Sequence, residues 1–369
     1  MSMQRKNYVI ELFRFFFCML IVNYHFFSHY TYSLDFPNFF ARAYVGDEFF
    51  FIVSGFFLVE AAMHTDKQPV EFALSQLVRR IKKIAIPYYL TWVVCFVGSH
   101  ISEAVFNQGK TDVVSDLLNS IYELTFTGMF GFMKAFYCNE AAWFFSALLI
   151  VSFILSPFAV KYKEKFSLYI APLIALVSYG ALSMFFDYLH TPYARFGTSI
   201  ILKGQIRALA AICLGCFIHG LVNTDGFKKL NKKRSDTARI ISLLDILVWG
   251  GVIIYLVYPF ESNNYKLDVQ YDYIAVFFMF LAMIPVMGGL FTIEKKKPAS
   301  VANSLGKYAY YAFCGQAMFH SVDLLVYYKT TLPLWSKFLI LNGSVAVSTL
   351  FIATVDRLVK KERRRLKTS

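Results

Sequence analysis

Long apolar stretches, most of them about twenty residues long, recur along the whole 369-residue chain. A helix of this length can cross the hydrocarbon core of a membrane, and it satisfies its own backbone hydrogen bonds where no water is present. Hydrophobic residues make up 57% of the chain and charged residues 17%, against about 25% charged residues in soluble domains. The sequence therefore predicts an all-α fold: a polytopic membrane helical bundle in a single domain over residues 1–369, with a basic cytoplasmic tail at 358–369.

Ten spans are predicted, and the basic residues between them predict their orientation. The spans are expected at 8–29, 42–62, 84–106, 141–160, 166–187, 198–222, 240–260, 272–293, 302–327 and 334–357. Most of the 37 lysines and arginines lie in alternate connecting segments and at the two chain ends, as in cytoplasmic loops. Both termini are therefore expected in the cytoplasm. Contact with the lipid bilayer accounts for the net charge of +13 without nucleic acid as a partner.

Two acids, Asp47 and Glu48, stand at the head of the second predicted span, before an apolar run that reaches Val59. An ionisable group within a membrane helix is costly, and it persists where it is buried against a partner or used in chemistry. Because the chain turns back between the first two spans, His25 near the outer end of the first is expected to meet one of these acids. A carboxylate facing an imidazole can act as an acid–base pair, and it can equally lock two helices together.

A polar stripe along the first span contains Glu11, Arg14 and His25. The eleven-residue step from Arg14 to His25 brings the two side chains to within about 20° around the helix and separates them by about 16 Å along it. Such a stripe should face the protein interior, with Glu11 placed three residues before Arg14 to pair with it.

The first two spans resemble motifs of the acyltransferase 3 family. Glu-Leu-Phe-Arg at 11–14 followed by His25 is similar to the first-span pattern, and Gly-Asp-Glu-Phe-Phe-Phe-Ile-Val-Ser-Gly-Phe at 46–56 is similar to the second-span motif, with Glu48 at the acid position. Later segments resemble the family in the same order: 79–89 its basic cluster before a proline-broken third span, 142–148 its fourth-span tryptophan motif, and 205–215 its sixth-span arginine segment. The ninth span departs from the family, because Gln316 stands where a histidine is often found.

The resemblance implies transfer of an acyl group, commonly acetyl, from cytoplasmic acyl-CoA to a hydroxyl of a cell-surface glycan or its lipid-linked precursor, in the plasma membrane of a bacterium. Acyl-CoA is then a donor substrate, and neither a permanently bound cofactor nor a metal is expected. His25 would deprotonate the hydroxyl or carry the acyl group itself, since an imidazole titrates near neutral pH. Glu48 would orient His25, as the acid does in hydrolytic triads, and Arg14 would support the donor.

The same resemblance assigns residues to the two substrates. Cations are expected to hold acyl-CoA, chiefly through its phosphates: Arg79, Arg80, Lys82, Lys83 and the buried Arg207. The first four are equally consistent with an ordinary membrane anchor. Candidate acceptor-binding residues are Trp143, Gln316, His320 and Asp323. Alternative roles are an interfacial position for the tryptophan and capping or packing for the last two.

Two other functions remain open on the sequence. Ten spans with intramembrane charges suit a transporter or exporter of a glycan or small metabolite, although no internal repeat or pair of broken helices is evident. A membrane sensor would use the basic tail to engage lipid or a partner. A homo-oligomer is also compatible with the chain. Loss of transfer on removal of His25 would separate an enzyme from the other two classes.

Overall fold

The computed structural model describes residues 7–30, 39–106, 112–131, 138–139, 142–232, 236–259, 270–317 and 332–366. Helices account for nearly all of the regular structure in these ranges, and extended pairing is limited there to an isolated bridge between Arg195 and Leu202. The predicted all-α class is therefore confirmed.

Each predicted span overlaps a helix of the structure. These helices are α1 (Tyr8–Tyr30), α2 (Gly46–Met63), α3 (Pro69–Phe106), α6 (Ala142–Lys165), α7 (Ala171–Phe185), α8 (Lys203–Val222), α10 (Asp236–Val257), α11 (Gln270–Met287), α12 (Lys296–Gly315) and α14 (Leu334–Arg365). Shorter elements connect them: η2 (Ala43–Val45), α4 (Val113–Asn119), α5 (Ile121–Leu124), η3 (Gly128–Phe130), η4 (Phe166–Ile170) and α9 (Asp225–Lys232).

Six helical stretches among the described residues are long and apolar enough to cross a membrane: Tyr8–Phe27, Pro69–Ile101, Ala142–Phe185, Lys203–Val222, Arg239–Val257 and Leu334–Arg365. The number is lower than ten partly because α6, η4 and α7 run together as one stretch. In addition, α2 carries three charged side chains, α12 is too polar over its length, and the apolar part of α11 is short. These findings agree with a multi-pass membrane protein, while the count of ten spans and the orientation of the termini stay predictions.

The backbones of α2 and α8 approach each other closely, and this contact positions the polar residues described in the next subsection. A Cβ atom added to Gly55 would lie 1.9 Å from the carbonyl oxygen of Ile212, and one added to Gly215 would lie 1.9 Å from that of Ile52. Only glycine permits this contact between backbones, as in other membrane helix pairs. The two helices run parallel, because side chains 159 residues apart are hydrogen-bonded near both ends of the pair.

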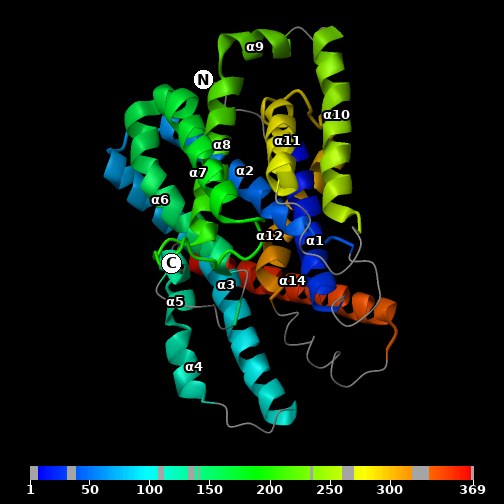
Figure 1. Cartoon of the computed structure of the whole chain (residues 1–369). Coiled ribbons are helices and arrows are strands. Elements are labelled where there is room, and N and C mark those ends of the chain that lie inside the picture. The colour runs from blue at the N-terminus through cyan, green and yellow to red at the C-terminus, as the bar shows by residue number, and fades with distance from the viewer. Residues whose placement is uncertain are drawn as a thin grey trace.

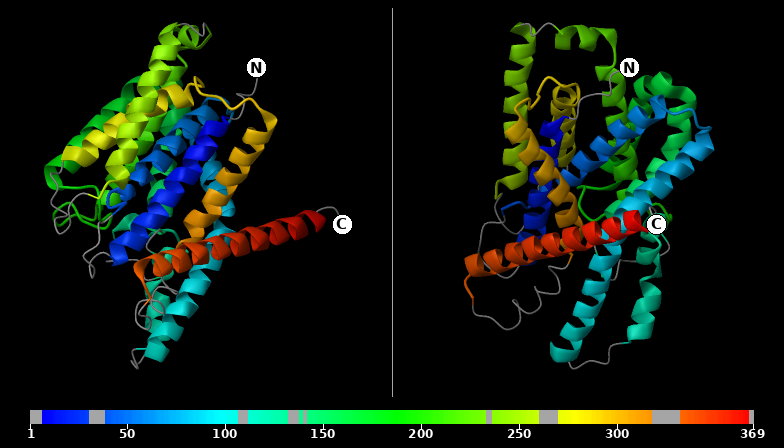
Figure 2. Two further views of the ribbon diagram at one scale, coloured as in Figure 1. Left: turned by 90° about the vertical axis from the view of Figure 1, so that its right-hand side faces the viewer. Right: turned by 180° about the vertical axis from the view of Figure 1, so that it is seen from behind.

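Helices α1, α6, α7 and α11 pack around this pair (Figure 1). α8 also packs against α6, α7 and α11, while α1 packs against α12. In both views of Figure 2, α14 crosses the other helices at a steep angle, and α3 extends beyond one end of the bundle. The polar ends of α1, α2, α8 and α11 that meet within the bundle form the site described next.

Candidate active site

A buried ion pair joins α2 to α8. Nε of Arg207 donates to Oε1 of Glu48 at 2.7 Å, and Nη2 donates to Oε2 at 2.8 Å. Glu48 is fully buried and Arg207 is 1% exposed. A bidentate arginine–carboxylate pair is among the stronger hydrogen-bonded contacts in proteins, and it is suited to a site that excludes water.

This pair corrects the expected partner of Glu48. The sequence placed His25 beside this carboxylate, but the side-chain hydrogen bonds of Glu48 go to Arg207. The reason is the glycine contact between α2 and α8. Glu48 lies seven residues before Gly55, and Arg207 lies eight residues before Gly215, so about two helical turns separate each from the point of closest approach.

The other N–H groups of Arg207 bind the chain's own backbone. Nη1 donates to the carbonyl of Leu189 at 2.9 Å, and Nη2 donates to that of Tyr44 at 3.2 Å. The guanidinium also lies over the ring of Trp143, 5.2 Å from its centroid. Arg207 is thus committed to holding α2, α6 and the segment before α8 together, and this geometry does not favour the expected contact with acyl-CoA.

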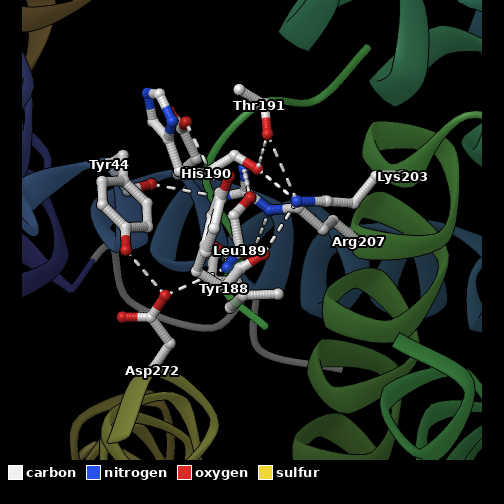
Figure 3. A network of polar contacts seen from close by, with 10 residues as sticks. Tyr44, Tyr188, Leu189, His190, Thr191, Lys203, Arg207 and Asp272 are labelled. Atoms are coloured by element: carbon white, nitrogen blue, oxygen red, sulfur yellow. Dashed lines mark hydrogen bonds and ion pairs between the residues drawn. The ribbon is translucent and has the colours of Figure 1, made fainter. Parts of the chain in front are cut away.

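One turn before Arg207, Lys203 fixes the same segment. Its Nζ donates to the carbonyls of Tyr188 and His190 and lies 3.4 Å from Oγ1 of Thr191 (Figure 3). The lysine is 1% exposed, although lysines are rarely buried without partners. The segment that precedes α8 is therefore folded back over the first turn of that helix.

Asp272 at the start of α11 connects this segment to Tyr44, as Figure 3 shows, and also to Tyr255. Its Oδ2 accepts hydrogen bonds from the hydroxyl of Tyr44 at 2.7 Å and from the backbone N–H of Leu189 at 3.0 Å, and its Oδ1 accepts one from the hydroxyl of Tyr255 at 2.8 Å. Asp272 and Glu48 are thus joined through Tyr44 and Arg207. We refer to Tyr44, Glu48, Lys203, Arg207 and Asp272 as the polar network.

His25 lies at the border of the polar network. Its ring centroid is 5.2 Å from that of Tyr24, and the Tyr24 ring lies 5.6 Å from Tyr44 and 5.9 Å from His190. The side chain is half-buried. His25 is therefore one aromatic ring away from Tyr44, and through Tyr44 it is connected to both carboxylates of the network.

His190 is a second histidine at this site, which the sequence did not reveal. Its ring is 5.3 Å from that of Tyr44, in the segment between α7 and α8. Burial and the positive charges of Arg207 and Lys203 together lower the pKa of His190 to about 4. The imidazole is therefore neutral at pH 7 and is a weak base. The sequence offered no local motif for it, since its neighbours come from helices distant along the chain.

A second charged group surrounds Glu11 in α1. Oε1 of Glu11 accepts a hydrogen bond from Arg14 at 3.1 Å, as expected from their spacing. Lys83 interacts electrostatically with Arg14 and Glu11, and also with Arg80 and Lys360. Gly306 of α12 makes room for Glu11, because a Cβ atom there would lie 2.0 Å from its Oε2. Cations from α1, α3 and α14 therefore lie near Lys83, and Lys360 among them is paired with Asp356. Arg14, Arg80, Lys83 and Lys360 are called the cation group below.

The other candidate residues are placed as follows. Trp143 is buried between Phe51 and Arg207 and does not occupy a lipid-facing interfacial position. Gln316 is buried in the turn after α12. His320 and Asp323 lie outside the described residues. Arg79 donates to Gln76 at the exposed surface of α3. Among the described residues, no group of three or more histidine, cysteine, aspartate or glutamate side chains is arranged to hold a metal ion.

A buried polar network within a bundle of apolar helices is the arrangement of a membrane-embedded site. A family model described as an acyltransferase domain, Acyl_transf_3, matches residues 7–355. The chain therefore belongs to the acyltransferase 3 family, as the motifs of its first two spans indicated, and this family membership supports a multi-pass membrane acyltransferase. Comparisons with curated proteins and with solved structures gave no match.

Proposed function

We propose that this protein transfers an acyl group, with acetyl the expected one, from cytoplasmic acyl-CoA to a hydroxyl of a cell-surface glycan or its lipid-linked precursor. One observation carries the proposal: α1 has the cation group near one end and a histidine beside a buried polar network near the other. Arg14 and His25 mark these two ends, about 16 Å apart along the helix. A donor and an acceptor could therefore approach the same helix from opposite sides of the membrane.

The cation group is proposed as the donor site. Arg14, Arg80, Lys83 and Lys360 carry more positive charge than the carboxylates of Glu11 and Asp356 neutralise. Guanidinium and ammonium groups bind phosphate through charge-assisted hydrogen bonds, and CoA carries several phosphates. With the predicted orientation, this group lies on the cytoplasmic side, where acyl-CoA is made. Arg79 and Lys82 on α3 extend the same positive surface.

The reaction itself needs a base and a site for the departing thiol. In the proposed step, the imidazole of His25 takes the proton of the acceptor hydroxyl, and the oxygen attacks the thioester carbonyl. The C–S bond then breaks, and the CoA sulfur takes the proton back from the imidazolium. In the alternative route, His25 first receives the acyl group and then passes it to the hydroxyl.

Glu48 and Arg207 are proposed as positioning residues. Glu48 holds Arg207 by hydrogen bonds, and Arg207 holds the backbone carbonyls of Tyr44 and Leu189. The Tyr44 ring in turn packs against the ring of Tyr24, which lies beside His25. This role differs from direct orientation of His25 by a carboxylate. His190 touches the same rings, but a histidine with a pKa of about 4 is a weak base, so it is not proposed as the proton acceptor.

The proposed function is tested most broadly on whole cells. Cell-envelope glycans from cells with the protein and from cells lacking it would be compared by mass spectrometry, with the Lys161→Gln variant as an expression control on a different loop. Loss of an acetyl ester only in the cells without the protein is expected, and its sugar identifies the acceptor. Identical glycans in both, with an altered distribution of an unmodified glycan across the membrane, would favour a transporter instead.

A further inference from the structure

Two buried amides have no hydrogen-bond partner in the part of the chain that the structure describes. Gln316, in the turn after α12, is 5% exposed, and Asn139, shortly before α6, is 1% exposed. Within the described ranges, neither the side-chain nitrogen nor the side-chain oxygen of either residue is hydrogen-bonded. Such groups are rare in native proteins, because burial removes their hydrogen bonds to water without replacement. These four atoms can therefore be satisfied by a ligand.

Packing brings the two amides to the same region. Phe313, three residues before the glutamine, packs against Phe144 near the start of α6, with ring centroids 5.1 Å apart. Cys138, adjacent to the asparagine, packs against a small buried cluster that contains Ala317. Each amide therefore lies next to residues through which the end of α12 meets the segment leading into α6.

The carboxylate of Glu123, which accepts three hydrogen bonds, holds Asn139 in place. The buried Glu123 accepts hydrogen bonds from the backbone N–H groups of Cys138 and Asn139 at 3.0 and 3.1 Å, and from Nε1 of Trp92 at 2.9 Å. The carboxylate of Glu123 thus fixes the backbone at Cys138 and Asn139. The groups that remain for a ligand are the neutral side-chain amides.

We propose that Gln316 and Asn139 bind an uncharged, hydroxyl-rich acceptor, such as a neutral hexose unit, an inference that rests on the acyl transfer proposed above. An amide both donates and accepts hydrogen bonds, and so does a sugar hydroxyl. A carboxylate on the sugar would lose its hydration here without gaining an opposite charge, and it would lie near the buried carboxylate of Glu123, which is costly. The site therefore selects neutral sugars over uronic acids.

The amide site is linked to the polar network through the start of α6. The backbone carbonyl of Asn139 accepts a hydrogen bond from the backbone N–H of Ala142 at 2.9 Å, and the guanidinium of Arg207 lies over the ring of the next residue, Trp143. A sugar held by the amides would thus lie beside the element that also supports Glu48 and Arg207. This arrangement suits an acceptor subsite next to the reacting groups.

Ligand-observed NMR on the purified full-length protein in nanodiscs would test the assignment. The probe is methyl β-D-glucopyranoside, compared with D-glucuronic acid. The neutral glycoside should bind saturably, and the charged sugar should bind at least about tenfold more weakly. Gln316→Met keeps the length of the side chain and removes the amide, so it should weaken glycoside binding by about tenfold. Because the lost amide has no partner within the described ranges, the melting temperature should stay unchanged or rise.

Asn342→Leu is the matched control, since the amide that it removes already donates to the carbonyl of Phe338 at 3.0 Å. It should bind the glycoside as the wild type does. Equal binding of both sugars by the wild type, or unchanged glycoside binding by Gln316→Met, would overturn the assignment. Should the variant fail to fold, the wild-type preference between the two sugars decides alone. A wild type that binds the glycoside through Gln316 and transfers no acetyl group would instead overturn the proposed function and leave the amide site standing.

Discussion

Glu48 and Arg207 form a bidentate buried ion pair two helical turns from the glycine contact that joins α2 to α8. Two neighbouring features depend on this pair. Arg207 donates hydrogen bonds to the backbone carbonyls of Tyr44 and Leu189, and both of these residues are also hydrogen-bonded to Asp272. The acid of the second-span motif is therefore tied to the shape of the whole polar network.

Arg207→Ala should destabilise the protein by about 3–5 kcal/mol, because it leaves the carboxylate of Glu48 buried and unpaired. Replacing both residues with methionine should restore much of this loss, since the uncompensated charge is gone. Thermal unfolding in one detergent measures both. Arg14→Ala is the control, as its ion pair with Glu11 is partly exposed and should contribute less than about 1 kcal/mol. Equal losses for the two arginines would contradict this account of the network.

Arg80→Gln combined with Lys83→Gln should raise the KM for acyl-CoA by about tenfold or more, because two of the charge-assisted phosphate contacts are lost. Protein level and the KM for the acceptor should stay near normal. Lys161→Gln with Lys163→Gln removes two cations from a different predicted cytoplasmic segment and serves as the control. An unchanged KM for acyl-CoA would contradict the donor site and indicate that the α3 cations serve only as a membrane anchor.

The predicted orientation can be tested by cysteine labelling of intact cells after the native cysteines are replaced. A membrane-impermeant reagent should label cysteines placed at Lys110 or Lys266 and should fail to label those placed at Lys232 or Lys296. This pattern follows from the basic residues of alternate loops. The reverse pattern would place the cation group outside and remove the basis of the donor assignment.

His190 should make the protein sensitive to acid. Its pKa is about 4 in the folded protein, below the value near 6.5 of an unfolded histidine, so the unfolded chain takes up the proton first. The free energy of unfolding should therefore be unaffected by this residue above about pH 6.5 and should fall as the pH drops from there towards 4. His190→Gln should reduce that fall. Melting temperatures at pH 7.5 and 5.0 check this, with His64→Gln, whose ring is more exposed, as control. An identical acid response in His190→Gln would refute it.

Much of the fold followed from the sequence, because apolar stretches of membrane length report helices directly. The pairing of Glu11 with Arg14 also followed, since a spacing of three residues places two side chains on the same helix face. The partner of Glu48 did not follow. It depends on which helix lies beside α2, and the glycines that decide this, Gly55 and Gly215, are far apart in the chain.

The same limit applies to the residues that the sequence missed. His190 and Asp272 acquire their roles only when α1, α8 and α11 come together, and neither stands in a motif of its own. Lys203 and Arg207 lie four residues apart on one helix face, which was a usable signal for a buried cationic site. Asn139 gave no signal, because an orphaned amide is visible only once its surroundings are known.

The central claim is that His25 acts on the acceptor hydroxyl or on the acyl group. Acetyl transfer by purified His25→Ala, with its melting temperature matched to that of the wild type, tests this most directly. General base catalysis contributes about 10²–10⁴-fold, so turnover should fall by at least 100-fold while the KM for acyl-CoA changes little. His100→Ala, at a histidine on α3, should retain wild-type turnover. Wild-type turnover by His25→Ala would contradict the account and assign the chemistry to another residue.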